Sequence, residues 1–261
     1  MNPELVLSHF SLPRAHPIVD RVRLAAAAGF DGIGLYVGNY AQLEADGFAP
    51  HGLRDLLAEH SLRLREIEVI PALGVDAGER EATAWRMADE FGCRYVQVIG
   101  PGGDDIALAA RAFGAICDRA ADHGLVVGLE FLPFTDIVSV DDARRIVEAA
   151  DRANGGICVD IWHHERGARD LAAIARVPGE LITGIQLSDG SVIAKDADYY
   201  TDCLANRVAP GDGEFDVAGF IDAIRATGTA APWSLEVCSA LGWAQPEEHV
   251  HRISAGIRRF M

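Results

Sequence analysis

The sequence has 261 residues, of which 49% are hydrophobic and 24% are charged, and its formal net charge at pH 7 is -16. These values are typical of a globular protein with a large core, and one α/β barrel would use the whole length. The acidic balance argues against nucleic acid and membranes as partners, because no basic surplus is present to neutralise phosphates. We therefore expect a small-molecule substrate, a sugar or cyclic polyol, and homo-oligomerisation is left open.

The cysteines and the N-terminal segment bear on the cellular compartment. The five cysteines lie far apart without a CxxC pair, as expected for reduced thiols. The first residues, MNPELVLSHFSL, have no basic region before the apolar run and lead directly into a strand pattern. No segment has the apolar length of a membrane span. Together these features predict a cytoplasmic protein.

Apolar runs typical of buried strands alternate with amphipathic stretches typical of helices along the chain. We expect eight strands, at about 5 to 10, 31 to 37, 64 to 70, 93 to 99, 125 to 131, 156 to 162, 181 to 187 and 233 to 238. Helices are expected between them, for example at 17 to 28, 78 to 91, 105 to 122, 139 to 153 and 215 to 227. Many helices end at a glycine just before the next strand, which is typical of βαβ units. This alternation predicts a single-domain (β/α)8 TIM barrel over residues 1–261, rather than an open doubly wound sheet.

Each predicted strand carries a polar side chain between apolar neighbours, so that it faces the opposite side of the strand from them. In chain order these residues are His9, Tyr36, Glu68, Gln97, Glu130, Asp160, Gln186 and Glu236. Three of the last four are carboxylates, which repel each other and lose hydration in a water-poor interior unless they are protonated or neutralised. Because the reacting groups of such barrels lie at the C-terminal strand ends, we expect one divalent metal ion near strands five to eight.

The expected ligands are Glu130, Asp160, Gln186 and Glu236. Their oxygen atoms suit Mg²⁺ or Mn²⁺, with Co²⁺ and Zn²⁺ as alternatives. Three carboxylates around a divalent ion leave one net negative charge, so that one of them can act as a base. The competing interpretation is that these residues form salt bridges with Lys or Arg inside the barrel, although the predicted strand cores contain almost no basic residue.

Further candidates flank these strand ends. His163 follows Asp160 by three residues and could move a proton near neutral pH, although loop histidines are more often surface residues. Arg207 ends the longest connection, from Asp189 to Gly213, which we expect to be a lid or binding loop. Its guanidinium group could bind a substrate oxygen or carboxylate, or pair with an acid of its own loop.

Three more residues could contact the substrate. Trp162 is one of several aromatic residues near the same rim that could form the apolar wall of a pocket, although any single one is more often core. His9 and Glu68 could contact the substrate or support the residues that do.

Several segments, in this order and spacing, resemble the xylose isomerase-like TIM-barrel superfamily: AAAAGFDGIGLYV, GLEFLP, VDIWH, IQLSDG, RVAPGDGEFD and SLEV. The resemblance implies that Glu130, Asp160, the strand-seven residue and Glu236 bind one divalent cation. It also implies that His163 and Arg207 contact the substrate, and that Glu130 and Glu236 exchange protons with a substrate carbon.

The strand-seven residue departs from part of this superfamily. Ketose epimerases usually have histidine where this chain has Gln186. A glutamine there, together with Asp160 and His163, resembles the 3-dehydroshikimate dehydratase branch, in which such a glutamine is a ligand. This difference does not change the predicted metal site, but it leaves open whether the reaction is epimerisation or dehydration.

Three functions follow. The leading one is a metal-dependent isomerase or epimerase of a keto-sugar or related polyol, which removes a proton next to a metal-bound carbonyl to give an enediolate. The alternative is a metal-dependent dehydratase, a lyase of the 3-dehydroshikimate or inosose type, in which His163 removes the proton and a β-hydroxyl leaves as water. The third is a non-catalytic polyol-binding barrel whose metal site is incomplete because of Gln186.

Overall fold

The computed structural model describes residues 3–71, 78–100 and 105–261. Eight parallel strands form a closed barrel in chain order, and β1 pairs with β8 to close it. The strands are β1 (Leu5–Leu7), β2 (Gly32–Tyr36), β3 (Arg63–Pro71), β4 (Tyr95–Ile99), β5 (Val126–Glu130), β6 (Gly155–Asp160), β7 (Ile182–Leu187) and β8 (Trp233–Leu235). This architecture confirms the predicted (β/α)8 TIM barrel.

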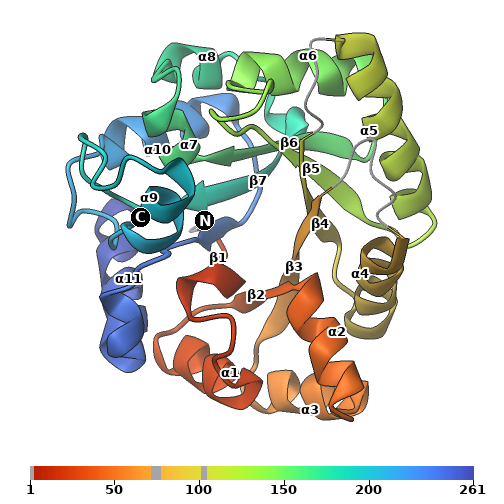
Figure 1. Cartoon of the computed structure of the whole chain (residues 1–261), viewed down its shortest axis with the longest axis vertical. Coiled ribbons are helices and arrows are strands. Elements are labelled where there is room, and N and C mark those ends of the chain that lie inside the picture. The colour runs from red at the N-terminus through yellow and green to blue at the C-terminus, as the bar shows by residue number, and fades with distance from the viewer. Residues whose placement is uncertain (1–2, 72–77, 101–104) are drawn as a thin grey trace.

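Helices surround the barrel on all sides (Figure 1). The α-helices are α1 (Ile18–Ala27), α2 (Val37–Ala45), α3 (Pro50–Glu59), α4 (Gly78–Phe91), α5 (Ile106–Ala121), α6 (Val140–Ala150), α7 (Ile161–Arg166), α8 (Leu171–Ala175), α9 (Tyr199–Ala205), α10 (Val217–Thr227) and α11 (Pro246–Ile257). Short 3-10 helices are η1 (His9–Ser11), η2 (Gly179–Leu181), η3 (Gly242–Ala244) and η4 (Arg258–Phe260).

Within the described segments, no helix combines the length and apolar character needed to cross a membrane. All five cysteines are buried free thiols.

Helices α6 and α10 begin at side-chain caps. The Ser139 hydroxyl accepts the N–H of Asp142 at 3.3 Å, and α6 begins at the next residue. The Asp216 carboxylate accepts the N–H of Gly219 at 2.9 Å at the start of α10. Each cap satisfies a backbone donor that has no partner within the first turn. Helix α6 therefore begins one residue later, and α10 two residues later, than the predicted ranges that started at 139 and 215.

The first and last strands are shorter than expected. The Ser8 hydroxyl accepts the N–H of Phe10 at 3.2 Å and starts η1, so β1 ends at Leu7. Strand β8 ends at Leu235, but the Glu236 N–H still donates to the Leu187 carbonyl at 3.0 Å. Glu236 is therefore attached to β7 although it lies one residue beyond its own strand.

Glycines in the strands make room for large side chains inside the barrel. A Cβ atom at Gly184 would lie 2.0 Å from the Tyr95 hydroxyl, and one at Gly128 would lie 2.3 Å from it. A Cβ at Gly34 would lie 1.8 Å from a carboxylate oxygen of Glu68. These three positions admit no larger residue without displacing the side chain that they face.

Candidate active site

The acidic residues of the second half gather where four neighbouring strands end. Glu130 and Asp160 are the last residues of β5 and β6, Gln186 lies one residue before the end of β7, and Glu236 follows β8. Asp160 stands opposite Gln186 in the β6–β7 register. All four side chains are buried. The local cause is the parallel register, which brings the carboxyl ends of the strands to one mouth of the barrel.

Glu130, Asp160 and His163 form the group best suited to hold a metal ion. Their ligand atoms all lie within 4.8 Å of one another. Nε2 of His163 is 3.1 Å from Oε1 of Glu130 and 3.4 Å from Oδ2 of Asp160. Asp160 caps α7 by accepting the N–H of Trp162 at 2.8 Å, so His163 lies one helical turn along and on the same side. The sequence suggested His163 for proton transfer and substrate contact, and its closeness to two carboxylates also makes it a candidate ligand.

Arg207 lies between two of the carboxylates. Its Nη1 donates to Oδ2 of Asp160 at 2.8 Å and to the backbone carbonyl of Glu236 at 3.2 Å, and is 3.9 Å from Oε2 of Glu236. Its Nε donates to the Cys203 carbonyl at 3.1 Å. Arg207 therefore pairs with an acid of β6, not with an acid of its own loop, and the salt bridge considered as the competing interpretation exists at Asp160. A buried pair of this kind needs such additional hydrogen bonds to offset desolvation.

The remaining charges fit a divalent cation. Glu130, Asp160 and Glu236 carry three negative charges when ionised, whereas Arg207 supplies one positive charge and His163 a second when protonated, so at least one negative charge stays unbalanced. Oε2 of Glu236 is buried without a hydrogen-bond partner. Burial, followed by the charges of Asp160 and Glu130, raises the pKa of Glu236 to about 7, although Arg207 lowers it. A buried carboxylate with an oxygen that accepts no hydrogen bond, beside two other carboxylates, is the arrangement that a bound cation would stabilise.

The electrostatics of His163 depend on the same acids. Burial lowers the pKa of the imidazole, but the charges of Asp160 and Glu130 outweigh burial and raise the pKa above its usual value. The second ring nitrogen, Nδ1, lies 2.6 Å from the Tyr199 hydroxyl. Both nitrogens of this ring therefore have polar neighbours. The adjacent His164 is also buried, against Phe220, and burial lowers its pKa to about 4.

Gln186 is held by a second amide. Its Nε2 donates to Oε1 of Gln97 at 3.1 Å, and its Oε1 accepts from Nε2 of Gln97 at 3.4 Å and from the Cys158 thiol at 3.6 Å. Nε2 of Gln97 also donates to Oε2 of Glu130 at 2.7 Å. Gln186 is thus connected to Glu130 through Gln97, and its oxygen is engaged away from an ion. Its assignment as a ligand stays a prediction, and it requires the amide to give up these contacts.

The other expected substrate contacts have defined neighbours. Glu68 accepts the Ser8 hydroxyl at 2.8 Å and the His9 N–H at 2.7 Å, so it fixes the turn after β1. Nε2 of His9 lies 3.0 Å from Oδ1 of Asn39. The Trp162 ring is completely buried, with the guanidinium carbons of Arg166 and Arg207 at 4.3 and 5.3 Å from its centroid. Contact between Trp162 and the substrate stays a prediction, and in the structure α7 begins directly after Asp160 and packs the ring beside Arg207.

Sequence reasoning missed two residues near this site. Glu66 lies two residues before Glu68 on β3, so the strand period places both on one face, and the Ser234 hydroxyl donates to it at 2.5 Å. Burial raises the pKa of Glu66 to about 8. The period of two could have identified Glu66. Tyr199 has no such signal, because it lies in the middle of the long connection.

The long connection is folded, as a binding loop would need to be. It contains α9, and Asp189 at its start forms a bridge to Val208 near its end. The Asp189 carboxylate accepts the N–H groups of Gly211, Gly213 and Phe215 at 2.9 to 3.0 Å. These bonds join the start of the connection to its end, and α9 lies between the two.

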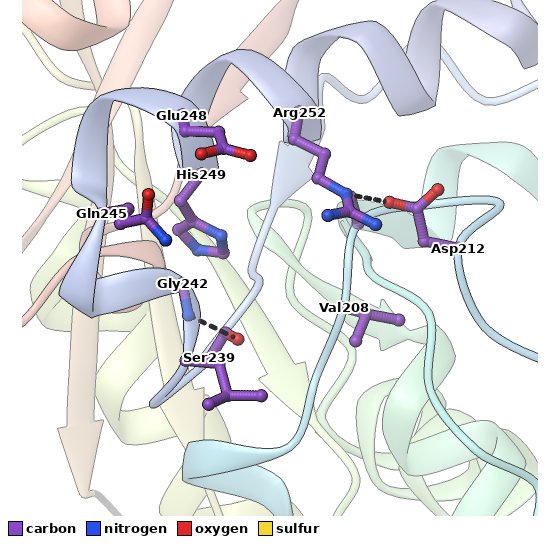
Figure 2. Close-up of a pocket in the computed structure, with 10 residues that line it drawn as sticks. Val208, Asp212, Ser239, Gly242, Gln245, Glu248, His249 and Arg252 are labelled. Carbon is purple, nitrogen blue, oxygen red and sulfur yellow. Dashed lines mark hydrogen bonds and ion pairs between the residues drawn. The ribbon is translucent and has the colours of Figure 1, made fainter.

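Figure 2 shows a separate pocket of about 310 Å³ between the segment after β8, α11 and the loop that contains Val208 and Asp212. Gln245, Glu248 and His249 are among its lining residues. The residues that line it do not include the carboxylates at the ends of β5, β6 and β8. This pocket is distinct from the acidic cluster.

The family model for xylose isomerase-like TIM barrels matches residues 22–258 of the chain. The chain belongs to this family. A 3-dehydroshikimate dehydratase from Pseudomonas aeruginosa is 32% identical over 231 residues, which are 84% of this chain and 36% of that protein. This xylose isomerase-like barrel thus spans about a third of the length of that curated relative.

Two solved structures share the fold. The IOLI protein, solved with a zinc atom, superposes with a TM-score of 0.87 at 16% identity, and the match covers 98% of this chain and 97% of that one. A D-allulose 3-epimerase from Methylomonas sp. superposes with a TM-score of 0.78 at 16% identity, covering 99% and 98% of the two chains. At these identities the likeness concerns the barrel fold alone.

Proposed function

We propose that this chain is a metal-dependent enzyme that removes a proton from the carbon next to a carbonyl group, and that it dehydrates 3-dehydroshikimate or a close analogue. The observation that carries the proposal is the position of His163, whose Nε2 lies 3.1 Å from Glu130 and 3.4 Å from Asp160 at the barrel mouth. The 32% identity with a 3-dehydroshikimate dehydratase supports the choice of substrate. Because the chain matches about a third of that relative, the activity is a proposal for this barrel alone.

Glu130, Asp160 and Glu236 would hold the ion, with Gln186 completing the ligands and His163 left free for proton transfer. The oxygen ligands favour Mg²⁺ or Mn²⁺, with Co²⁺ and Zn²⁺ as alternatives. When bound, the ion would supply Lewis acidity toward the substrate carbonyl, which makes the neighbouring proton easier to remove.

His163 is the group that we assign to proton transfer. Nε2 of the neutral imidazole takes the proton from the carbon, and the electron pair of that C–H bond forms a carbon–carbon double bond as the bond to the β-hydroxyl breaks. The same proton then passes to the departing hydroxyl, which leaves as water. The carboxylates of Glu130 and Asp160 stabilise the imidazolium between these two transfers.

Arg207 holds the site together and limits how a substrate binds. Because its Nη1 is 2.8 Å from Asp160, a substrate carboxylate would compete with Asp160 for the same donor. We therefore assign Arg207 first to orienting Asp160 and the backbone of Glu236. Direct contact with the substrate remains a prediction.

The expected isomerase or epimerase activity is the second candidate. It is favoured by the unpartnered oxygen of Glu236 and by the rise of its pKa to about 7, which suit a carboxylate that takes up and returns a proton. The structural likeness to a D-allulose 3-epimerase is consistent with it, at the level of the fold. In this reaction Glu130 and Glu236 would exchange the proton on opposite faces of the carbon.

One experiment separates the two candidates. The purified protein is incubated with Mn²⁺ and either 3-dehydroshikimate or a ketohexose in deuterated water. Dehydration gives an aromatic product with new ultraviolet absorption, which the His163→Ala variant should form about a thousandfold more slowly. Deuterium at carbon 3 of the ketohexose, without any aromatic product, would overturn the dehydratase proposal in favour of the epimerase. Binding of either compound without exchange or turnover would favour the non-catalytic barrel.

A further inference from the structure

The helix α9 of the long connection packs on α7 through two matched polar pairs. His163 and Arg166 are three residues apart on α7, and Tyr199 and Asp202 are three residues apart on α9. Nδ1 of His163 lies 2.6 Å from the Tyr199 hydroxyl, and Nε of Arg166 donates to Oδ2 of Asp202 at 3.0 Å. Residues three apart lie on one face of a helix, so the two pairs fix both the distance and the rotation of α9 against α7.

The second pair is well anchored. Besides Arg166, the buried Asp202 carboxylate accepts the backbone N–H of Lys195 at 3.0 Å and the Asn206 side chain at 3.2 Å. The same helix supports Arg207, because the Cys203 carbonyl accepts Nε of Arg207 at 3.1 Å. One short helix therefore touches both the imidazole and the guanidinium group that lie beside the carboxylates.

The ring of Tyr199 also packs near two other rings, those of His163 and Phe134. Its ring is near parallel to that of His163, with centroids 6.0 Å apart and an angle of 18°, and its centroid lies 4.8 Å from that of Phe134. The ring contacts leave the hydroxyl little freedom to move away from Nδ1. The hydroxyl is therefore placed by packing rather than by solvent.

We propose that Tyr199 is a positioning residue that orients His163 for proton transfer. The hydroxyl can donate to Nδ1 or accept its N–H, so the contact holds the ring whichever nitrogen carries the hydrogen. The contact thus keeps the edge of the ring that bears Nε2 turned toward Glu130 and Asp160. This inference rests on the proposed function, since it assigns His163 a part in the reaction.

The test is a double-mutant cycle with Tyr199→Phe, which removes only the hydroxyl and keeps the ring contacts. With Mn²⁺ and 3-dehydroshikimate, we expect Tyr199→Phe to lower kcat roughly tenfold and to change KM less than about twofold. In the His163→Ala background the same substitution should have no further effect. Equal losses in both backgrounds, or no loss in the wild type, would overturn the inference.

Tyr200→Phe is the matched control. Tyr200 also contacts Phe134, with centroids 4.6 Å apart, and its side chain is exposed. We expect wild-type kcat and KM for this variant. A tenfold loss in Tyr200→Phe as well would mean that loss of a hydroxyl from α9 lowers kcat without the contact to His163, and would overturn the inference.

A measurement without turnover keeps the two proposals separable. In long-range proton–nitrogen spectra of the protein, the ring nitrogens of His163 are identified by their loss in His163→Ala. Tyr199→Phe should shift the Nδ1 resonance, and Tyr200→Phe should not. If 3-dehydroshikimate is not turned over, the proposed function fails, whereas an unchanged Nδ1 resonance in Tyr199→Phe would refute the contact itself.

Discussion

The barrel contains two groups of buried acids that are stabilised in different ways. On β3, Glu66 and Glu68 accept hydrogen bonds from serine hydroxyls, and burial raises the pKa of both, so Glu66 is protonated near neutral pH. At the ends of β5, β6 and β8, the carboxylates instead have Arg207, His163 and one unpartnered oxygen beside them. Burial of an acid alone therefore does not distinguish the two groups, whereas the neighbours of each acid do.

The largest expected effect tests this contrast directly. Glu236→Gln removes one negative charge and a possible base, so turnover should fall by about a thousandfold or more, with the fold intact by circular dichroism. Glu66→Gln is the matched control, because glutamine replaces a carboxyl group that is already uncharged and can keep the contact with Ser234. Activity and thermal unfolding of both variants are measured side by side. A loss of activity in Glu66→Gln as large as that in Glu236→Gln would break the distinction.

Metal removal should affect the acids at the ends of β5, β6 and β8 and not those on β3. Dialysis against a chelator should abolish turnover, and Mn²⁺ should restore it. An ion present at a hundred times its Kd stabilises the native state by about 2.7 kcal/mol, which appears as a rise in Tm. The rise should persist in Glu66→Gln and shrink strongly in Glu236→Gln. Equal rises in Tm for all three proteins would place the ion elsewhere.

The buried acids of β3 should make the stability of the protein depend on pH. Burial raises the pKa of Glu66 from 4.5 to about 8, so the native state holds this proton more tightly than the unfolded chain. The resulting stability is fully present below about pH 4.5 and is lost progressively up to about pH 8, at no more than about 1.4 kcal/mol per pH unit. Glu66→Gln should remove this decline, so its Tm relative to wild type should increase between pH 6 and pH 8. This is followed by thermal unfolding in matched buffers, and a constant difference would contradict the assignment.

The smallest effect lies outside both groups. Ser139→Ala removes the hydroxyl that caps α6, which should lower the free energy of unfolding by about 1 kcal/mol. Since Ser139 belongs to neither set of acids, kcat should stay at the wild-type value. Urea unfolding measures the first quantity and the dehydration assay the second. A change in kcat would show that the loop after β5 takes part in the reaction.

The sequence predicts the barrel well because the alternation of apolar runs and helices is a local signal. The period of two along the strands likewise identifies Glu130, Asp160 and Glu236. Contacts between distant segments leave no such pattern. Arg207 lies 47 residues from Asp160, and Tyr199 lies 36 residues from His163, in a connection without regular periodicity.

Glu66 shows a different limit. Its position on the inner face follows from the strand period, but the space for Glu66 and Glu68 depends on the missing side chain of Gly34 on the neighbouring strand. That relation requires the β2–β3 register, which pairs Gly34 with Glu66 after an irregularity. Gln186 could be singled out from sequence, whereas its pairing with Gln97, 89 residues away, could not.

The Gln97 side chain links β4 to the acids of the other half, because it bonds Glu130 and Gln186 at once. Exchange of half-barrels between relatives would therefore separate Gln97 from the two residues that it bonds. In a chimera whose first half comes from a relative, the hydrogen bond to Glu130 would be kept only if β4 of that relative had a glutamine at the position of Gln97. Recombination of these barrels is thus constrained by a pair of glutamines as well as by the residues that meet the substrate.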